Sequence, residues 1–165
     1  MQQEKIYNVL FLCTGNSARS VLSEAMLNHL GAGRFRAFSA GSKPSGSVHP
    51  ASLRLLQRKG LPIAGLRSKS WDEFSAKEAP QMDMILTVCG NAAGEACPVW
   101  LGHPVTAHWG VDDPAACKGS EDEQDKVFEQ AYQRLSHRIE LLISLPIEKL
   151  EPVVLKEALQ AIGKT

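Results

Sequence analysis

The sequence predicts an α/β fold with three layers, in which a four-stranded central parallel sheet is flanked by helices. Short apolar runs of the kind that form buried strands alternate along the chain with segments whose apolar residues recur at helical spacing. Two of these runs are followed directly by a cysteine, Cys13 and Cys89. Ligands of parallel α/β folds bind at the carboxyl ends of the strands, so both thiols are expected at the functional edge of the sheet.

In the first half of the chain, glycine and turn residues separate the predicted strands and helices. An unbroken apolar run at 9–12 predicts a buried strand, and helical spacing from Ser17 to Leu30 predicts a helix that Gly31 ends. Alternation predicts the next strand, and a leucine-rich stretch ended by Gly60 predicts the next helix. In chain order the expected elements are strands at 9–12 and 34–40, helices at 17–30 and 50–59, a helical turn at 71–74, strands at 82–88 and 105–108, and helices at 121–145 and 155–162.

The second half ends in a long amphipathic segment. Apolar residues from Phe128 to Leu142 are spaced four and three apart in turn, which predicts a helix with one buried face that Pro146 ends. The predicted domain organisation is therefore a catalytic domain at 1–145 and a C-terminal helical extension at 146–165. A stripe at 155–162 predicts that the extension packs on the domain rather than on a partner.

Composition restricts the function. The 165 residues suit one domain, and 18 basic against 18 acidic residues leave no global field for nucleic acid or an anionic membrane. The apolar run at 9–12 is too short for a signal or membrane segment, so a cytoplasmic protein is expected. Thiols stay reduced there, and the four cysteines do not have zinc-site spacing, so no metal is predicted.

The segment from Cys13 to Ser20 carries the candidate chemistry. It joins a buried strand to a helix start, where successive N–H groups and the helix dipole bind anions. The same field is expected to lower the pKa of the Cys13 thiol, and Ser20 can hydrogen-bond its sulfur. Arg19 can hold two oxyanion oxygens at once. The alternative is a strand-end cysteine beside a solvated arginine. The expected oxyanion-binding residues are Thr14, Gly15, Asn16, Ser17, Ala18, Arg19 and Ser20.

Three stretches of the sequence resemble one enzyme superfamily. VLFLCTGNSARSVLSEAML resembles the loop region of low-molecular-weight protein tyrosine phosphatases, whose loop is Cys-x5-Arg-Ser near the start of the chain. LTVCGNAAGEACP (86–98) and HWGVDDPA (108–115) are similar to the arsenate reductase branch of that superfamily. The resemblance covers about residues 6–143. It implies an enzyme that binds arsenate, or a phosphate-like oxyanion, and attacks it with the Cys13 thiolate.

The resemblance also implies a general acid. In the superfamily this is the Asp of an Asp-Pro pair, here Asp113-Pro114, which protonates the leaving oxygen. Taken alone, Asp112-Asp113-Pro114 would suit a plain turn. Asp112 is the alternative acid, and the role expected for it is to hold the loop.

Reduction of arsenate to arsenite requires two electrons, which thiols can supply. The resemblance assigns a disulfide relay to Cys13, Cys89 and Cys97 in that order, with thioredoxin or a glutathione/glutaredoxin pair as the external reductant and no bound cofactor. Alternatively, Cys89 is a small buried hydrophobe and Cys97 an incidental loop thiol. The spacing between the two is one residue longer than is usual in the superfamily. Cys117 has no role that the resemblance implies.

Some members of the superfamily bind potassium beside the loop, through residues matched here by Asn16, Glu24 and Ser39. The remaining ligand positions fall near 67–69, where basic residues repel a cation. We therefore predict no metal requirement, with the ammonium of Lys69 in place of the ion. His49 and His108 are expected to be structural, and Trp109 to pack at the base of the acid loop.

Two other functions remain open from the sequence. The first is a tyrosine phosphatase that hydrolyses phosphotyrosine or small aryl phosphates through the same loop. Such enzymes usually carry an aromatic residue directly after Asp-Pro, and Ala115-Ala116 here disfavour a bulky aryl substrate, although residual phosphatase activity is expected. The second is an oxyanion sensor without catalysis, which would need no acid.

Overall fold

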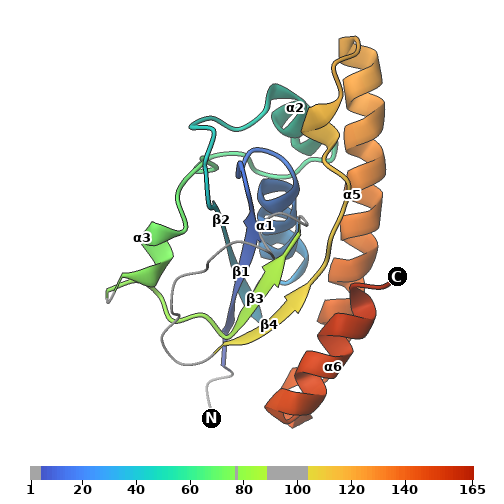
Figure 1. Ribbon diagram of the computed structural model, residues 1–165. Coiled ribbons are helices and arrows are strands. Elements are labelled where there is room, and N and C mark those ends of the chain that lie inside the picture. The colour runs from blue at the N-terminus through green and yellow to red at the C-terminus, as the bar shows by residue number, and fades with distance from the viewer. Residues whose placement is uncertain (1–4, 77, 89–103) are drawn as a thin grey trace.

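The computed structural model describes residues 5–76, 78–88 and 104–165. Four parallel strands form one sheet: β1 (Tyr7–Cys13), β2 (Phe35–Gly41), β3 (Met84–Thr87) and β4 (Val105–His108). Their order is β2-β1-β3-β4, so β1 is central and pairs with β2 and β3. The predicted fold class and four parallel strands are confirmed (Figure 1).

The central strand separates two apolar layers because its side chains alternate between the faces of the sheet. Val9, Phe11 and Cys13 join the larger cluster with residues of α1, α5 and α6, whereas Leu10 and Leu12 join the smaller one with Trp71. A strand that is buried on both faces reads as an unbroken apolar run. This explains why the 9–12 segment was recognisable in the sequence.

Helices cover both faces of the sheet. The elements of the larger layer are α1 (Arg19–Leu30), α2 (Pro50–Arg58), α5 (Glu121–Ile143) and α6 (Pro152–Ile162). The short α3 (Asp72–Ser75) lies on the opposite side (Figure 1). Two 3₁₀ turns, η1 (Pro114–Ala116) and η2 (Ile147–Lys149), precede α5 and α6. The parallel sheet between these helices is the predicted three-layer arrangement.

Most element boundaries differ from the sequence prediction by one to three residues. Helix α1 begins at Arg19 rather than Ser17, because Asn16 (φ 47°) and Ala18 (φ −134°) have non-helical backbone. Strand β3 begins at Met84 rather than 82, and the carboxylate of Asp83, directly before it, accepts a hydrogen bond from the N–H of Asn8.

The strand ends place the site. Cys13 is the last residue of β1, and the acid-loop segment follows β4 at the same edge of the sheet. Cys89 and Cys97 lie outside the described residues. Within the part of the chain that the structure describes, every helix is too short or too polar to cross a bilayer.

Candidate active site

The loop between β1 and α1 forms one wall of a small cavity of about 280 Å³. Asp113 lies across the cavity from this loop, although 94 residues separate it from Arg19 in the sequence. The structure therefore brings together the predicted nucleophile, arginine and acid. The residues that line the cavity are Cys13, Thr14, Gly15, Asn16, Ser17, Ala18, Arg19 and Asp113.

The loop is held from outside by the segment that follows β2. The N–H of Ser42 donates to the carbonyl of Cys13, and the next loop carbonyls are engaged in the same way by Lys43, Ser45 and His49. The four pairs are Ser42 to Cys13 (3.2 Å), Lys43 to Thr14 (2.9 Å), Ser45 to Gly15 (2.9 Å) and His49 to Ser17 (3.0 Å). Carbonyls that point outward are what an anion nest requires, because the loop N–H groups can then face the cavity.

The Cys13 sulfur is buried, and the loop supplies it with hydrogen-bond donors. The Sγ atom lies 2.9 Å from Ser20 Oγ, and the N–H of Asn16 donates to it at 3.2 Å. Only 2% of Cys13 is exposed, so the cavity is the route by which a ligand reaches the sulfur. Donors aimed at a sulfur favour the thiolate, which is the reactive form.

Asn16 organises the loop from within. Its backbone is left-handed (φ 47°), a conformation that asparagine tolerates better than most residues. Its Nδ2 donates to Ser20 Oγ (2.8 Å), and its Oδ1 accepts from the N–H of Lys69 (2.9 Å). Because Ser20 Oγ already accepts from Asn16, its own hydrogen can be directed to the Cys13 sulfur.

Arg19 connects the oxyanion loop to the acid loop. Its Nη1 donates to the carbonyl of Val111 (2.9 Å), and its Nη2 lies 3.6 Å from Asp113 Oδ2. The arginine side chain is 11% exposed and that of Asp113 is 44% exposed. The acid is therefore accessible to solvent at the mouth of the cavity while the guanidinium lies deeper.

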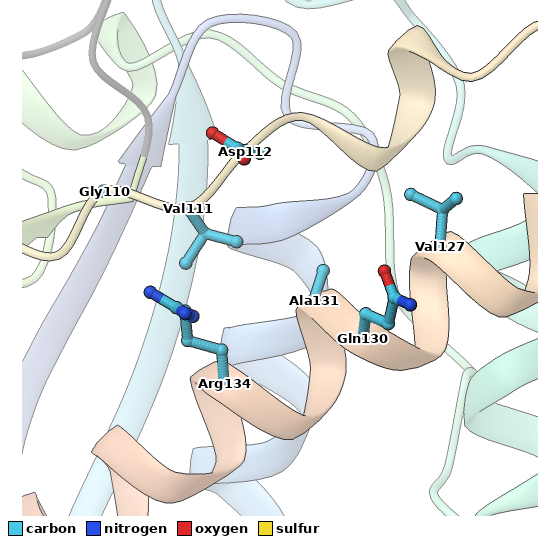
Figure 2. Close-up of a pocket in the computed structure, with 7 residues that line it drawn as sticks. All are labelled: Gly110, Val111, Asp112, Val127, Gln130, Ala131 and Arg134. Atoms are coloured by element: carbon cyan, nitrogen blue, oxygen red, sulfur yellow. The ribbon is translucent and has the colours of Figure 1, made fainter. Parts of the chain in front are cut away.

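The acid loop, residues 110–113, begins beside a second cavity of about 480 Å³ between this loop and α5. Figure 2 shows Val111 directed toward α5 and Arg134 extending from α5 toward the loop, whereas the Asp112 carboxylate points away from the helix. Asp113, but not Asp112, lines the cavity that contains Cys13. This geometry favours Asp113 over Asp112 as the acid.

Lys69 lies where the sequence predicted an ammonium in place of potassium. Its Nζ is 3.6 Å from Glu24 Oε1 and 3.5 Å from Ser39 Oγ, and it donates to the carbonyl of Arg67 at 3.0 Å. Burial lowers the pKa of Lys69, and the Glu24 carboxylate opposes that shift. The ammonium lies beside the oxygens of Glu24 and Ser39, which are the positions that match potassium ligands in the superfamily, and this arrangement is the one expected if Lys69 takes the place of the ion.

Two further side chains have the structural roles expected of them. His49 caps α2, since its Nδ1 accepts from the N–H of Ala51 at 3.0 Å. Trp109 is fully buried below the acid loop, and its ring lies 6.2 Å from that of Phe11.

Cys117 is partly exposed just after η1. In the described ranges no cluster of three or more His, Cys, Asp or Glu side chains could hold a metal ion, and the absence of a metal requirement stays a prediction.

Two contributors to the site were not found from the sequence. The segment 42–49 contacts the loop through backbone groups, and such contacts do not require particular residue types in the sequence. Gly41 is the second, because a Cβ there would lie 2.3 Å from the carbonyl oxygen of Thr14. The only sign in the sequence was a glycine at the end of an alternating strand, which is typical of a close backbone approach.

A parallel α/β sheet whose first strand ends in a buried cysteine, with an arginine-closed anion loop and a carboxylate facing it, defines the class of cysteine-dependent oxyanion enzymes. Within this class the chain belongs to the low molecular weight phosphotyrosine protein phosphatase family, whose model matches residues 8–153. The family resemblance predicted from the three motifs is thereby confirmed.

Known relatives include several arsenate reductases. The chain is 34% identical over 140 residues to the arsenate reductase of Bacillus licheniformis, a match that covers 84% of this chain and 94% of that protein. It is 28% identical over 136 residues to the glutaredoxin arsenate reductase of Synechocystis sp., which covers 82% and 95%. Among solved structures, an arsenate reductase in the phosphate binding state superposes with a TM-score of 0.65 at 27% identity, covering 84% and 98%.

Proposed function

We propose that this protein is an arsenate reductase that converts arsenate to arsenite. The observation that carries the proposal is a single cavity lined by Cys13, Arg19 and Asp113, in a chain similar to arsenate reductases over more than four fifths of its length. An anion nest suits any tetrahedral oxyanion, and the acid on the opposite wall suits a reaction in which an oxygen must leave.

In the first step the Cys13 thiolate attacks arsenic. A sulfur–arsenic bond forms and an arsenic–oxygen bond breaks, and Asp113 gives its proton to the departing oxygen, which leaves as water. Arg19 and the loop N–H groups balance the negative charge on the remaining oxygens. The arsenic is still in its +5 state, covalently bound to Cys13.

The second and third steps transfer the electrons. The Cys89 thiolate attacks the Cys13 sulfur, so that a disulfide forms, the sulfur–arsenic bond breaks and its electron pair stays on arsenic as arsenite departs. The Cys97 thiolate then attacks Cys89, which releases the Cys13 thiolate and leaves a Cys89–Cys97 disulfide. Each turnover thus oxidises two thiols while arsenic gains two electrons.

An external dithiol must reduce the final disulfide. We infer thioredoxin or a glutathione/glutaredoxin pair, and no bound cofactor, because the relay itself carries both electrons. The name of the Synechocystis relative supports a glutaredoxin-coupled donor as one of the two. A relay that begins with reduced thiols also supports action in the cytoplasm, where thiols are kept reduced.

We also infer residual hydrolysis of small aryl phosphates. Attack on phosphorus by Cys13, with protonation of the leaving oxygen by Asp113, needs no second thiol. Ala115 follows Pro114 and packs against the core instead of presenting an aromatic wall, so a bulky phosphotyrosine side chain has little to stack on. Tyrosine phosphatase activity is therefore the less favoured main function.

Mass mapping of disulfides after one arsenate turnover tests the reaction and the relay together. The wild-type protein should accumulate a Cys89–Cys97 disulfide, and Cys97→Ser should trap Cys13–Cys89. Cys117→Ser is the matched control, because it removes a partly exposed thiol that the relay does not use. A disulfide to Cys117 or a glutathione adduct in its place would contradict the Cys97 assignment, and no arsenate-dependent oxidation would contradict the proposed function.

A further inference from the structure

Arg138 on α5 is a buried cation in an unusual setting. Only 2% of it is exposed, and its Nε lacks a hydrogen-bond partner in the structure. Within the described ranges no Asp or Glu side chain pairs with it, and burial together with the neighbouring Arg134 lowers its pKa. A buried guanidinium is unfavourable for folding unless acceptors surround it, so the acceptors of Arg138 must be well placed.

Those contacts join two distant parts of the chain. Nη1 of Arg138 donates to the carbonyl of Gly110 at 3.1 Å, and Nη2 donates to the carbonyl of Thr165 at 3.1 Å. Gly110 begins the acid loop and Thr165 lies beyond the end of α6. One guanidinium therefore bridges the acid loop and the segment that follows the last helix.

The acid loop has few other supports. On the α5 side, where Val111 packs against the core, it also borders the cavity of about 480 Å³ (Figure 2). The N–H of Val111 donates to the carbonyl of Val88 (3.0 Å), and its carbonyl accepts from Arg19 (2.9 Å). Two successive carbonyls, those of Gly110 and Val111, are thus held by two different arginines, Arg138 from the core and Arg19 from the oxyanion loop.

Helix α6 makes a second set of contacts with the chain at the start of the acid loop. The indole N–H of Trp109, the residue before Gly110, donates to the carbonyl of Leu159 at 2.9 Å. At the end of α6 a Cβ on Gly163 would lie 2.2 Å from the carbonyl oxygen of His108. The helix therefore contacts the chain backbone where β4 leads into the acid loop, beside α5 (Figure 1).

We propose that Arg138 is a positioning residue for the general acid: by bridging Gly110 and Thr165 it fixes the start of the acid loop against α6 and so sets where Asp113 lies relative to Cys13. The inference rests on the proposed function, since it takes Asp113 as the acid. Arg138 does not touch the oxyanion and acts only through the loop. Oxyanion binding, which depends on residues 13–20, should be independent of it.

Two measurements on full-length Arg138→Met separate positioning from general damage. The first is the rate of thiol oxidation in a single turnover with arsenate, and the second is the protection of Cys13 from alkylation by arsenate, which needs binding but no acid. We expect the rate to fall by about tenfold to a hundredfold, as for a catalytic group misplaced by about 1 Å, with protection retained. In an Asp113→Asn background the same substitution should have no further effect.

Matched variants complete the test. Arg134→Met removes an arginine one turn earlier on α5, which in the structure donates no hydrogen bond to the described loop residues, and should keep the wild-type rate. Gly163→Ala disturbs the contact between α6 and the start of the acid loop without changing Arg138. It should also slow the turnover, so the inference can still be tested if Arg138→Met folds poorly. An unchanged rate in both Arg138→Met and Gly163→Ala would overturn the inference, as would an undiminished effect in the Asp113→Asn background. If Asp113→Asn alone kept the wild-type rate, it is the acid assignment in the proposed function that would fail.

Discussion

The sulfur of Cys13 and the hydroxyl oxygen of Ser20 lie 2.9 Å apart, so the two ends of the oxyanion loop meet at the reactive atom. Asn16 donates to the same hydroxyl and is itself held by the N–H of Lys69. This chain of contacts gives the hydroxyl hydrogen a defined direction. Ordered donors of this kind favour the ionised form of a thiol.

Replacing Ser20 by alanine should make the thiol harder to ionise. The pH profile of Cys13 alkylation by iodoacetamide is expected to shift upward by about one pH unit, since a hydrogen bond to a charged group contributes about 1.5–3 kcal/mol. Ser23→Ala is the control, because Ser23 is buried on the same helix but donates to the carbonyl of Arg19. Equal shifts in both variants would argue against a specific role for Ser20.

Asp113 and Asp112 should differ sharply in importance. Asp113→Asn is expected to slow single-turnover reduction of arsenate by about 10²–10⁴-fold, the usual contribution of a general acid. Asp112→Asn should change it little, because that carboxylate does not line the cavity of Cys13. The measurement is arsenite release under excess enzyme, and a larger loss in Asp112→Asn would reverse the assignment.

Lys69 is expected to make the enzyme independent of potassium. In Lys69→Ala the partly buried carboxylate of Glu24 loses its cation, so turnover should fall and potassium chloride should restore part of it. Tetramethylammonium chloride at equal ionic strength should not. Lys59→Ala removes an ammonium from an exposed pair with Glu129 and should show no such response. Equal stimulation of the wild type by potassium would refute the replacement.

His49 should make stability depend on pH. Burial and the nearby charge of Arg54 lower the pKa of His49 from its ordinary 6.5, so the unfolded chain binds the proton more readily than the folded one. Its contribution is therefore fully present above about pH 6.5 and is lost as pH falls through the lowered folded value. Protonated Nδ1 cannot accept from Ala51, and loss of such a cap costs about 1 kcal/mol.

Urea unfolding from about pH 7 to about pH 5 checks this expectation. His49→Asn should flatten the pH dependence, since the asparagine side chain can cap the helix without titrating. His137→Asn is the comparison, because His137 is exposed on α5. A dependence that survives in His49→Asn would assign it to another group.

Much of the site could be predicted because its chemistry is local in sequence. The residues from Cys13 to Ser20 are consecutive, and a buried strand followed by turn residues and a helix fixes how they are presented. Asp113 needed the family resemblance, since Asp-Pro alone is also a common turn. The wider support of the loop was not predictable, because Gly41 and the 42–49 segment act through backbone contacts across the fold.

The spacing of Arg138 in the sequence already placed this charged residue among apolar ones, although no prediction was drawn from it. It lies three residues after Leu135 and four before Leu142, and therefore on the apolar stripe of α5. A charged residue at such spacing indicates either a break in the stripe or a buried polar contact. Only the docking of α6, which is distant in sequence, decides between the two.

Gly41 determines how closely the end of β2 can approach the oxyanion loop. A Cβ at this position would lie 2.3 Å from the carbonyl oxygen of Thr14, so a larger residue would have to displace the loop from the sheet. The shape of the loop around Cys13 is therefore set by the sheet beside it as well as by the residues of the loop itself.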